Sequence, residues 1–208
     1  MEEEGGRSAR KRRAIMEAAT AVFLRNGYRG TSMDEIAARA AVSKQTVYKQ
    51  FADKERLFTE IILATIDQVG EPFHAEVITL GDTDDLEGEL GALARRLIAA
   101  VMAPDVLRLR RLVIAEADRF PQLGRTYYER GPGRTAAALA AHFRRLAERK
   151  LLRLHDPLAA AHQFNWLITS VPLNQVMLCG SAVRFNTADL EGFADAGVRL
   201  FLAAYGRS

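Results

Sequence analysis

Apolar residues recur at intervals of three and four along nearly all of this 208-residue chain, and this spacing constrains the fold more than any other feature. The repeat is clear near the N-terminus, at Ile15, Ala19 and Phe23. Such intervals place apolar side chains on one face of an α-helix, whereas the alternation typical of strands is scarce. We therefore predict an all-α fold of about nine helices.

Capping and breaking residues set the predicted limits of these helices. Asn26-Gly27 offers the left-handed residue that ends a helix, and Ser32 followed by Glu35 is a capping-box pattern. Gly70–Pro72 predicts a bend or break, and Gly131–Gly133 predicts a disturbance. The predicted helices cover residues 8–26, 32–40, 43–50, 53–80, 84–102, 104–120, 125–150, 157–180 and 188–205.

Two predicted helices are short, at residues 32–40 and 43–50, and the turn Ala40-Ala41-Val42 joins them. Residues 5–58 carry 12 Lys and Arg against 5 Asp and Glu, whereas residues 59–208 carry 17 against 18. A basic segment that contains two short helices predicts a helix-turn-helix facing a nucleic-acid backbone. We expect a disordered tip over residues 1–7, a helix-turn-helix domain over residues 8–58 and a larger helical domain over residues 59–208.

The second short helix has polar side chains that its buried face does not need, because Val47 and Phe51 occupy the inward positions. Such side chains are free to contact base edges in the major groove of double-stranded DNA. The predicted base contacts are Lys44, Gln45, Thr46 and Lys49. The predicted phosphate contacts lie near helix starts or in the basic N-terminal segment, and they are Thr31, Ser32, Ser43, Tyr48, Lys54, Arg10 and Arg13. A solvated N-terminus is the alternative for each arginine.

Residues 15–58 resemble the DNA-binding domain of the TetR family of bacterial repressors. The residues that carry the resemblance are Phe23, Gly27, Tyr28, Gly30, Thr31, Ser32, Met33, Ile36, Ala37, Val42, Ser43, Lys44, Val47, Tyr48, Phe51, Lys54, Glu55, Leu57 and Phe58. Gln45 and Gln50 depart from the residues common in the family, so the base preference of a relative does not transfer. Residues 111–134 resemble the C-terminal domain of the AefR-like subgroup. The resemblance implies a second, helical domain that binds a ligand and forms a dimer.

The segment between Asp156 and Arg184 contains 27 positions without a single Asp, Glu, Lys or Arg. A helix of this composition is buried on most sides, and a membrane span is the less favoured reading because polar amides and histidines interrupt it. We expect it to pack against the last helix and a second copy of the chain. The predicted dimer interface comprises Phe164, Leu167, Ile168, Val171, Leu178, Leu190, Phe193, Ala194, Gly197, Val198 and Phe201.

Uncharged polar and aromatic side chains on the apolar helices predict a pocket for a small, mostly apolar or aromatic effector. Ordinary buried hydrogen bonds are the alternative for each residue taken singly. The candidates are Met102, Tyr127, Tyr128, His142, Phe143, Phe164, Asn165, Trp166, Thr169 and Gln175.

Several classes of function lack support in the sequence. The single cysteine, Cys179, excludes an internal disulfide and is expected to be buried filler, and the four histidines lack metal-ligand spacing. No catalytic motif is found, so we expect neither an enzyme nor a cofactor. The predicted function is a cytoplasmic, dimeric, sequence-specific regulator, a repressor released from a near-palindromic operator by its effector. A helical protein that binds DNA without sequence preference is the alternative.

Overall fold

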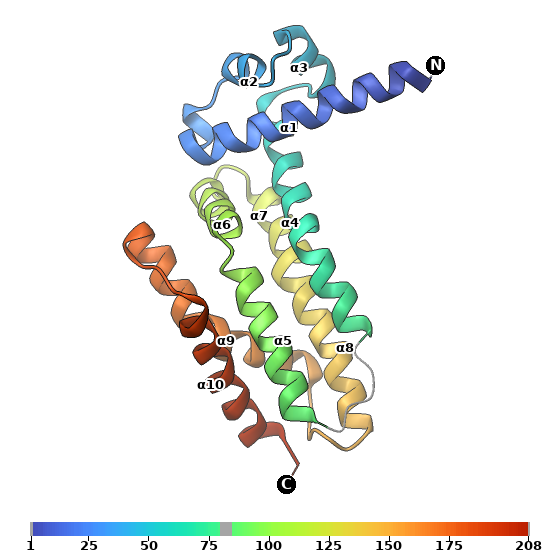
Figure 1. Ribbon diagram of the computed structural model, residues 1–208, viewed down its shortest axis with the longest axis vertical. Coiled ribbons are helices and arrows are strands. Elements are labelled where there is room, and N and C mark those ends of the chain that lie inside the picture. The colour runs from blue at the N-terminus through green and yellow to red at the C-terminus, as the bar shows by residue number, and fades with distance from the viewer. Residues whose placement is uncertain (1, 80–84, 208) are drawn as a thin grey trace. The chain divides into compact units, whose positions relative to one another are not determined.

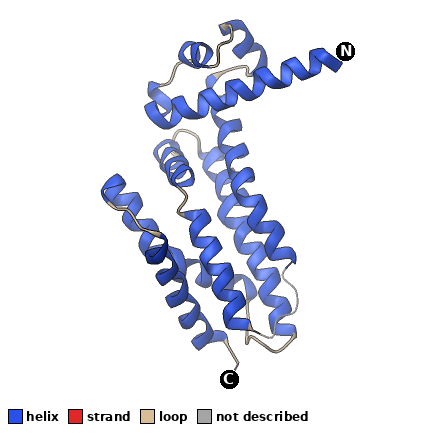
Figure 2. Cartoon of the chain, in the orientation of Figure 1, coloured by secondary structure: helices blue, strands red, loops and turns tan. Residues whose placement is uncertain are grey.

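The computed structural model describes residues 2–79 and 85–207, which form helices and connecting loops without a strand (Figures 1 and 2). The all-α prediction is therefore confirmed for the described part of the chain. The α-helices are α1 (Glu2–Gly30), α2 (Met33–Arg39), α3 (Lys44–Gln50), α4 (Lys54–Thr79), α5 (Leu86–Val101), α6 (Pro104–Glu116), α7 (Pro121–Tyr128), α8 (Arg134–Glu148), α9 (Pro157–Cys179) and α10 (Thr187–Tyr205). A π-helical turn covers Glu129–Gly133, and a 3-10 turn covers Gly180–Ala182.

The predicted helices and the observed ones differ mainly where glycine or proline is involved. The helix predicted over residues 125–150 is two helices, α7 and α8, because the Gly131–Gly133 segment forms the π-helical turn between them. α4 is a single helix that continues through Gly70 and Pro72, so the predicted break is absent. The predicted limits at Leu80 and Asp84 lie outside the described residues.

The first helix begins at Glu2, where the sequence predicted a disordered tip as far as residue 7. Its regular part ends at Gly27, whose φ of 70° and ψ of 177° break the helical backbone. A side chain is strained at such a positive φ, and glycine, which has no Cβ, adopts it readily. The predicted end of this helix at Asn26-Gly27 is thus confirmed.

The described chain divides into two compact units, and neither is a continuous segment. The N-terminal unit comprises the residues as far as Thr65 together with Arg108–Tyr127, and the C-terminal unit comprises Ile66–Leu107 together with the residues from Tyr128 onward. Residues 108–127 thus group with the first helices, whereas the sequence predicted a single domain boundary, after residue 58.

An aromatic cluster explains why the later segment joins the N-terminal unit. The Phe120 ring lies 4.9 Å from the Tyr28 ring and 6.1 Å from the Phe58 ring, measured between centroids. Phe23 also packs against Phe58, at 5.0 Å. Phe23 and Phe58 are fully buried or nearly so, and buried aromatic pairs contribute about 0.5–1.5 kcal/mol beyond the area they remove from water.

The core of the C-terminal unit forms where α5, α8, α9 and α10 meet. Phe143, Phe164 and Phe201 are each fully buried, and their ring centroids lie 5.0–5.3 Å apart. α9 and α10 lie side by side (Figure 1). Their backbones approach closely at Gly197, where an added Cβ would stand 2.7 Å from Ile168 Cγ1. The glycine therefore permits the spacing of these two helices.

A polar group of three side chains interrupts the apolar core between α5 and α8. His142 Nε2 lies 2.8 Å from Glu89 Oε1, and the Arg145 guanidinium donates to His142 Nδ1 at 3.3 Å and to Val77 O at 3.2 Å. Burial, with a smaller contribution from Arg145, lowers the pKa of His142 to about 4. The imidazole is therefore neutral near pH 7, with the Nδ1 lone pair free to accept from Arg145.

Candidate nucleic-acid interface

The two short helices α2 and α3 are capped and joined as a helix-turn-helix requires. Ser32 Oγ accepts from Glu35 N at 3.1 Å, and Ser43 Oγ accepts from Thr46 N at 3.1 Å. Between the helices, Ala41 has a φ of 52°, and the Val42 amide closes the turn by donating to Ala37 O at 3.1 Å. The left-handed residue ends α2 and redirects the chain into α3.

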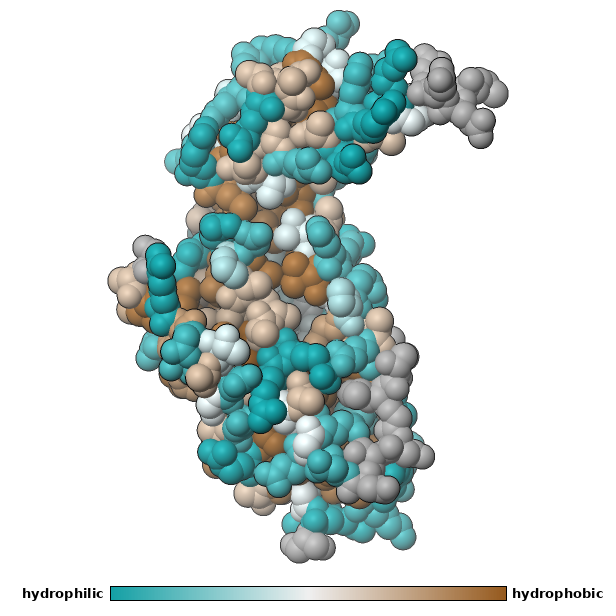
Figure 3. All heavy atoms as spheres, in the orientation of Figure 1, coloured by the Kyte–Doolittle hydropathy of each residue, from teal (hydrophilic) through white to brown (hydrophobic). Residues whose placement is uncertain are grey.

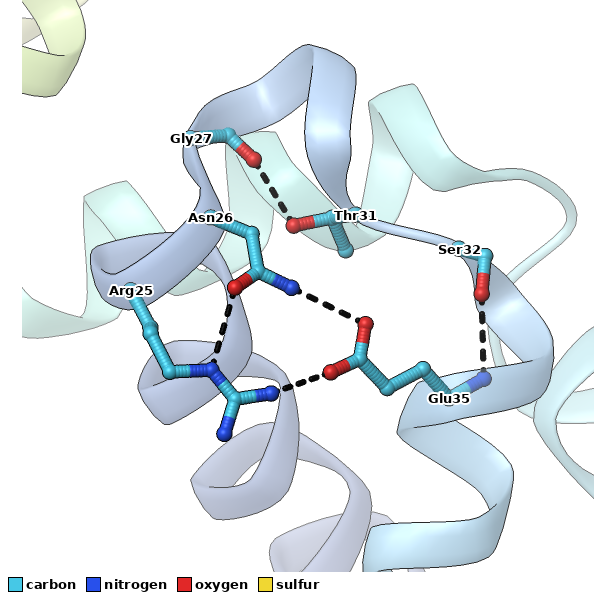
Figure 4. A network of polar contacts seen from close by, with 6 residues as sticks. All are labelled: Arg25, Asn26, Gly27, Thr31, Ser32 and Glu35. Carbon is cyan, nitrogen blue, oxygen red and sulfur yellow. Dashed lines mark hydrogen bonds and ion pairs between the residues drawn. The ribbon is translucent and has the colours of Figure 1, made fainter.

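Figure 4 shows the polar network that fixes α2 against the end of α1. The Glu35 carboxylate accepts from Arg25 and, at 3.0 Å, from Asn26 Nδ2, and the Thr31 hydroxyl donates to Gly27 O at 2.7 Å. The predicted capping box is only half formed, because the Glu35 side chain bonds to α1 and not to the Ser32 amide. Glu35 therefore sets the angle between two helices.

The predicted base-contacting residues lie on the outer side of α3. Lys44, Gln45 and Lys49 are exposed, whereas Val47 on the opposite side is fully buried. Thr46 is half-buried, and its hydroxyl lies 2.8 Å from Ser43 Oγ. The Lys44 ammonium group forms an ion pair with Asp34 of α2. The structure thus places a row of amide and ammonium donors on one accessible helix face.

Five of the seven predicted phosphate contacts are exposed, as contacts with a DNA backbone need to be. They are Ser32, Ser43, Tyr48, Arg10 and Arg13. On the face drawn in Figure 3, hydrophilic side chains cover much of this N-terminal unit.

Thr31 and Lys54, the other two predicted phosphate contacts, form internal contacts in the single chain. Thr31 is buried, with its hydroxyl bonded to Gly27 O. The Lys54 ammonium group donates to Tyr28 O at 2.9 Å and to Thr31 O at 2.8 Å, and it lies 4.5 Å from the centre of the Tyr28 ring. Carbonyl groups left over at the end of α1 recruit this cation, so Lys54 ties the start of α4 to the α1–α2 connection.

The sequence reading did not anticipate that the basic start of α1 packs against the end of α3. Arg12 donates to Gln50 O at 3.2 Å, pairs with Glu60 and lies 4.4 Å from the centre of the Phe51 ring. Gln50 Nε2 donates to Ser8 Oγ at 2.9 Å. The spacing of the sequence could have predicted this packing. Positions 8, 12, 15 and 19 share one helix face, and Ile15 and Ala19 on that face are buried.

The predicted pocket residues differ in burial and belong to both units. Met102, His142, Phe143, Phe164 and Thr169 are buried in the C-terminal unit, whereas Tyr127 is buried in the N-terminal unit. Asn165 is half-buried. Tyr128, Trp166 and Gln175 are exposed, so these three do not line a buried pocket within the chain. The Thr169 hydroxyl donates to Asn165 O at 2.7 Å, an ordinary helical bond.

The predicted dimer-interface residues separate into a buried set and an exposed set. Six are buried inside the core of the single chain, where their side of each helix is already covered: Phe164, Ile168, Ala194, Gly197, Val198 and Phe201. Leu190 and Phe193 are half-buried. Leu167, Val171 and Leu178 are 41%, 50% and 83% exposed, and Trp166 beside them is 51% exposed.

These four exposed residues, Trp166, Leu167, Val171 and Leu178, form what we call the α9 apolar face. Cys179 follows the face and is exposed, contrary to the expected burial. The pattern of apolar residues did not reveal which positions of α9 are exposed. The helix is apolar on nearly every side, which hides the difference between its inner and outer faces.

Other kinds of site have no counterpart in the described residues. No three His, Cys, Asp or Glu side chains between residues 2–79 and 85–207 are arranged to hold a metal ion. Among the helices of this same part of the chain, none is long and apolar enough to cross a membrane.

Comparisons with known proteins match both parts of the chain. Residues 15–61 match the model of the bacterial regulatory proteins of the tetR family. Residues 88–207, more than half of the chain, match the C-terminal domain of AefR-like transcriptional repressors. Both resemblances expected from the sequence are confirmed.

Individual relatives agree with these family matches. A TetR-family transcriptional regulator from Mesorhizobium loti is 49% identical, with 97% of this chain and 99% of that chain covered and a TM-score of 0.90. The flavonoid-responsive regulator FrrA is 30% identical, with 95% and 98% covered and a TM-score of 0.75. The DNA-binding transcriptional repressor TetR of Mycobacteroides abscessus is 35% identical over 98 residues, 46% of this chain and 50% of that relative. The match to this curated relative thus spans about half of its length. The chain belongs to the TetR family of bacterial regulatory proteins, and its C-terminal domain is of the AefR-like type.

Proposed function

We propose that the protein is a dimeric, sequence-specific DNA-binding regulator, a repressor that leaves a near-palindromic operator when a small effector binds. The observation that carries this proposal is the row of hydrogen-bond donors, Lys44, Gln45 and Lys49, on the outer side of α3. The opposite side of α3 packs into the helix-turn-helix through the fully buried Val47. Lysine and glutamine match the acceptor and donor patterns that base pairs present in the major groove. A protein that acts by binding a DNA sequence needs no catalytic groups.

The α9 apolar face supports the dimer. Exposed aromatic and aliphatic side chains at positions 166, 167, 171 and 178 are costly in water, and burial against a second copy would remove that cost. Family membership favours a second copy of this chain as the partner. A two-fold axis would then present two α3 helices to grooves about 34 Å apart, which requires an operator with matching half-sites.

Substitutions on α3 test the division between base contacts and backbone contacts. We expect Gln45→Ala to relax the sequence preference at one position of each half-site, because a bidentate pair with a base discriminates by about 1–3 kcal/mol. Tyr48→Phe is expected to weaken binding to all duplexes by similar factors, because a phosphate contact carries no sequence information. Selection of bound duplexes from a random pool, followed by footprinting, measures both effects.

The wild-type protein provides the first control for this test. Protection of a discrete, symmetric site is expected, whereas protection without sequence preference would support the alternative of a general DNA-binding helical protein. A base-specific loss on Tyr48→Phe together with a uniform loss on Gln45→Ala would contradict the assigned roles.

The effector is proposed to be a mostly apolar, aromatic compound that binds the C-terminal unit. FrrA, which is 30% identical, is named for its response to flavonoids, and flavonoids are compounds built on aromatic rings. A panel of flavones and flavanones titrated into the complex of the protein with its selected operator is the direct probe. We expect at least one compound to release the DNA, measured by fluorescence anisotropy.

Coupling is the quantity that decides this part of the proposal. Ligand and operator must favour different conformations, so operator affinity must fall as the ligand saturates the protein. A compound that binds the protein tightly and leaves operator affinity unchanged would argue against release by that class of ligand.

A further inference from the structure

An ion pair connects the two helices of the helix-turn-helix at its outer surface. Lys44 Nζ lies 2.8 Å from Asp34 Oδ1 and 3.1 Å from Asp34 Oδ2, so one ammonium group is shared between both carboxylate oxygens. The side chains are 60% and 65% exposed. Both side chains are therefore accessible from solvent.

The positions of the two residues explain why the pair forms. Lys44 is the first residue of α3, where the free amides of the helix make a positive charge unfavourable. Asp34 is the second residue of α2, where the same effect favours a negative charge. The negative Asp34 carboxylate offsets the unfavourable interaction between the Lys44 cation and the free amides of α3. Its hydrogen bond and charge raise the pKa of Lys44.

We propose that Asp34 is a specificity-determining residue, which holds the Lys44 ammonium group so that its remaining N–H meets a base acceptor at one position only. The inference rests on the proposed function, in which α3 enters the major groove. On any duplex, Lys44 stays on Asp34, so the phosphates gain one cation fewer. On the operator, the held ammonium group donates its remaining N–H to the base.

The test compares Asp34→Asn with Asp118→Asn, which makes the same change of charge at an exposed position of the N-terminal unit. For Asp34→Asn, we expect affinity for random duplex to rise about fivefold, which is the size of an exposed ion-pair effect. Operator affinity should change little, so discrimination falls by about the same factor. The slope of log K against log salt for random duplex should steepen by about 0.9, the value for one more phosphate contact.

A double substitution separates positioning from charge. With Lys44→Ala as background, Asp34→Asn should no longer alter discrimination, because no ammonium group remains to be held. Thermal unfolding of each variant checks that the helix-turn-helix remains folded.

Two failures are distinguishable in this design. If the wild-type protein selects no discrete site, the proposed function itself is wrong. If the wild type selects a site and Asp34→Asn matches Asp118→Asn in discrimination and salt slope, then only the role of Asp34 is refuted. An unchanged effect of Asp34→Asn in the Lys44→Ala background would likewise overturn the inference, because the carboxylate would then act without the lysine.

Discussion

Replacing Leu167 and Val171 together by glutamate should convert the protein to a monomer and reduce operator affinity by at least about a hundredfold. Both side chains lie on the α9 apolar face and are about half exposed in the single chain, so the substitutions leave the protomer core intact. Four carboxylates across a two-fold interface would be buried without partners, a cost that exceeds the apolar gain. Loss of the second copy removes the second α3 helix from the operator.

Sedimentation and fluorescence anisotropy on the same samples measure the two effects together. Ile114→Glu is the matched control, because Ile114 is a 62% exposed aliphatic residue in the N-terminal unit. It should leave the protein dimeric. A double variant that stays dimeric at micromolar concentration would show that the α9 apolar face is not the interface.

Phe164→Ala is expected to lower the free energy of unfolding by about 3–5 kcal/mol, the range for a buried phenylalanine whose site cannot collapse. Phe164 is fully buried and touches Phe143 and Phe201, which also have no exposure, so the cavity would be enclosed on both sides. Chemical denaturation at fixed protein concentration measures the loss.

Trp166→Ala is the control, because it removes a larger side chain from an exposed position two residues further along α9. In the monomeric background of the Leu167 and Val171 double substitution, its cost should stay within about 0.5 kcal/mol. A cost below about 1 kcal/mol for Phe164→Ala would mean that the aromatic core is not packed as described here.

Local chemistry was predictable from the sequence, and choices among distant partners were not. Ser32 caps α2 as predicted, because a cap needs only residues within one turn. The partner of the Glu35 carboxylate depends on where α1 ends in space, and the carbonyls that bind Lys54 belong to a segment 23–26 residues earlier. No periodic pattern encodes such pairs.

The candidate interface between subunits shows a second limit of sequence reasoning. In α9, apolar residues face both the core and the solvent, so Phe164 and Leu167 look alike in the sequence and differ only in burial. α3 posed no such difficulty, because polar side chains surround a single buried valine. Clear amphipathicity therefore located the outer side of α3, and its absence obscured the outer side of α9.

The division of the chain bears on how its parts can be exchanged with those of relatives. Because Phe120 completes the packing of Tyr28 and Phe58, a fragment cut after Thr65 would lack one wall of its own aromatic centre. A hybrid regulator that borrows its operator preference from this protein has to carry two separate stretches of sequence. Grafting only the residues as far as Thr65 would transfer the helix-turn-helix without Phe120, on which the packing of Tyr28 and Phe58 depends.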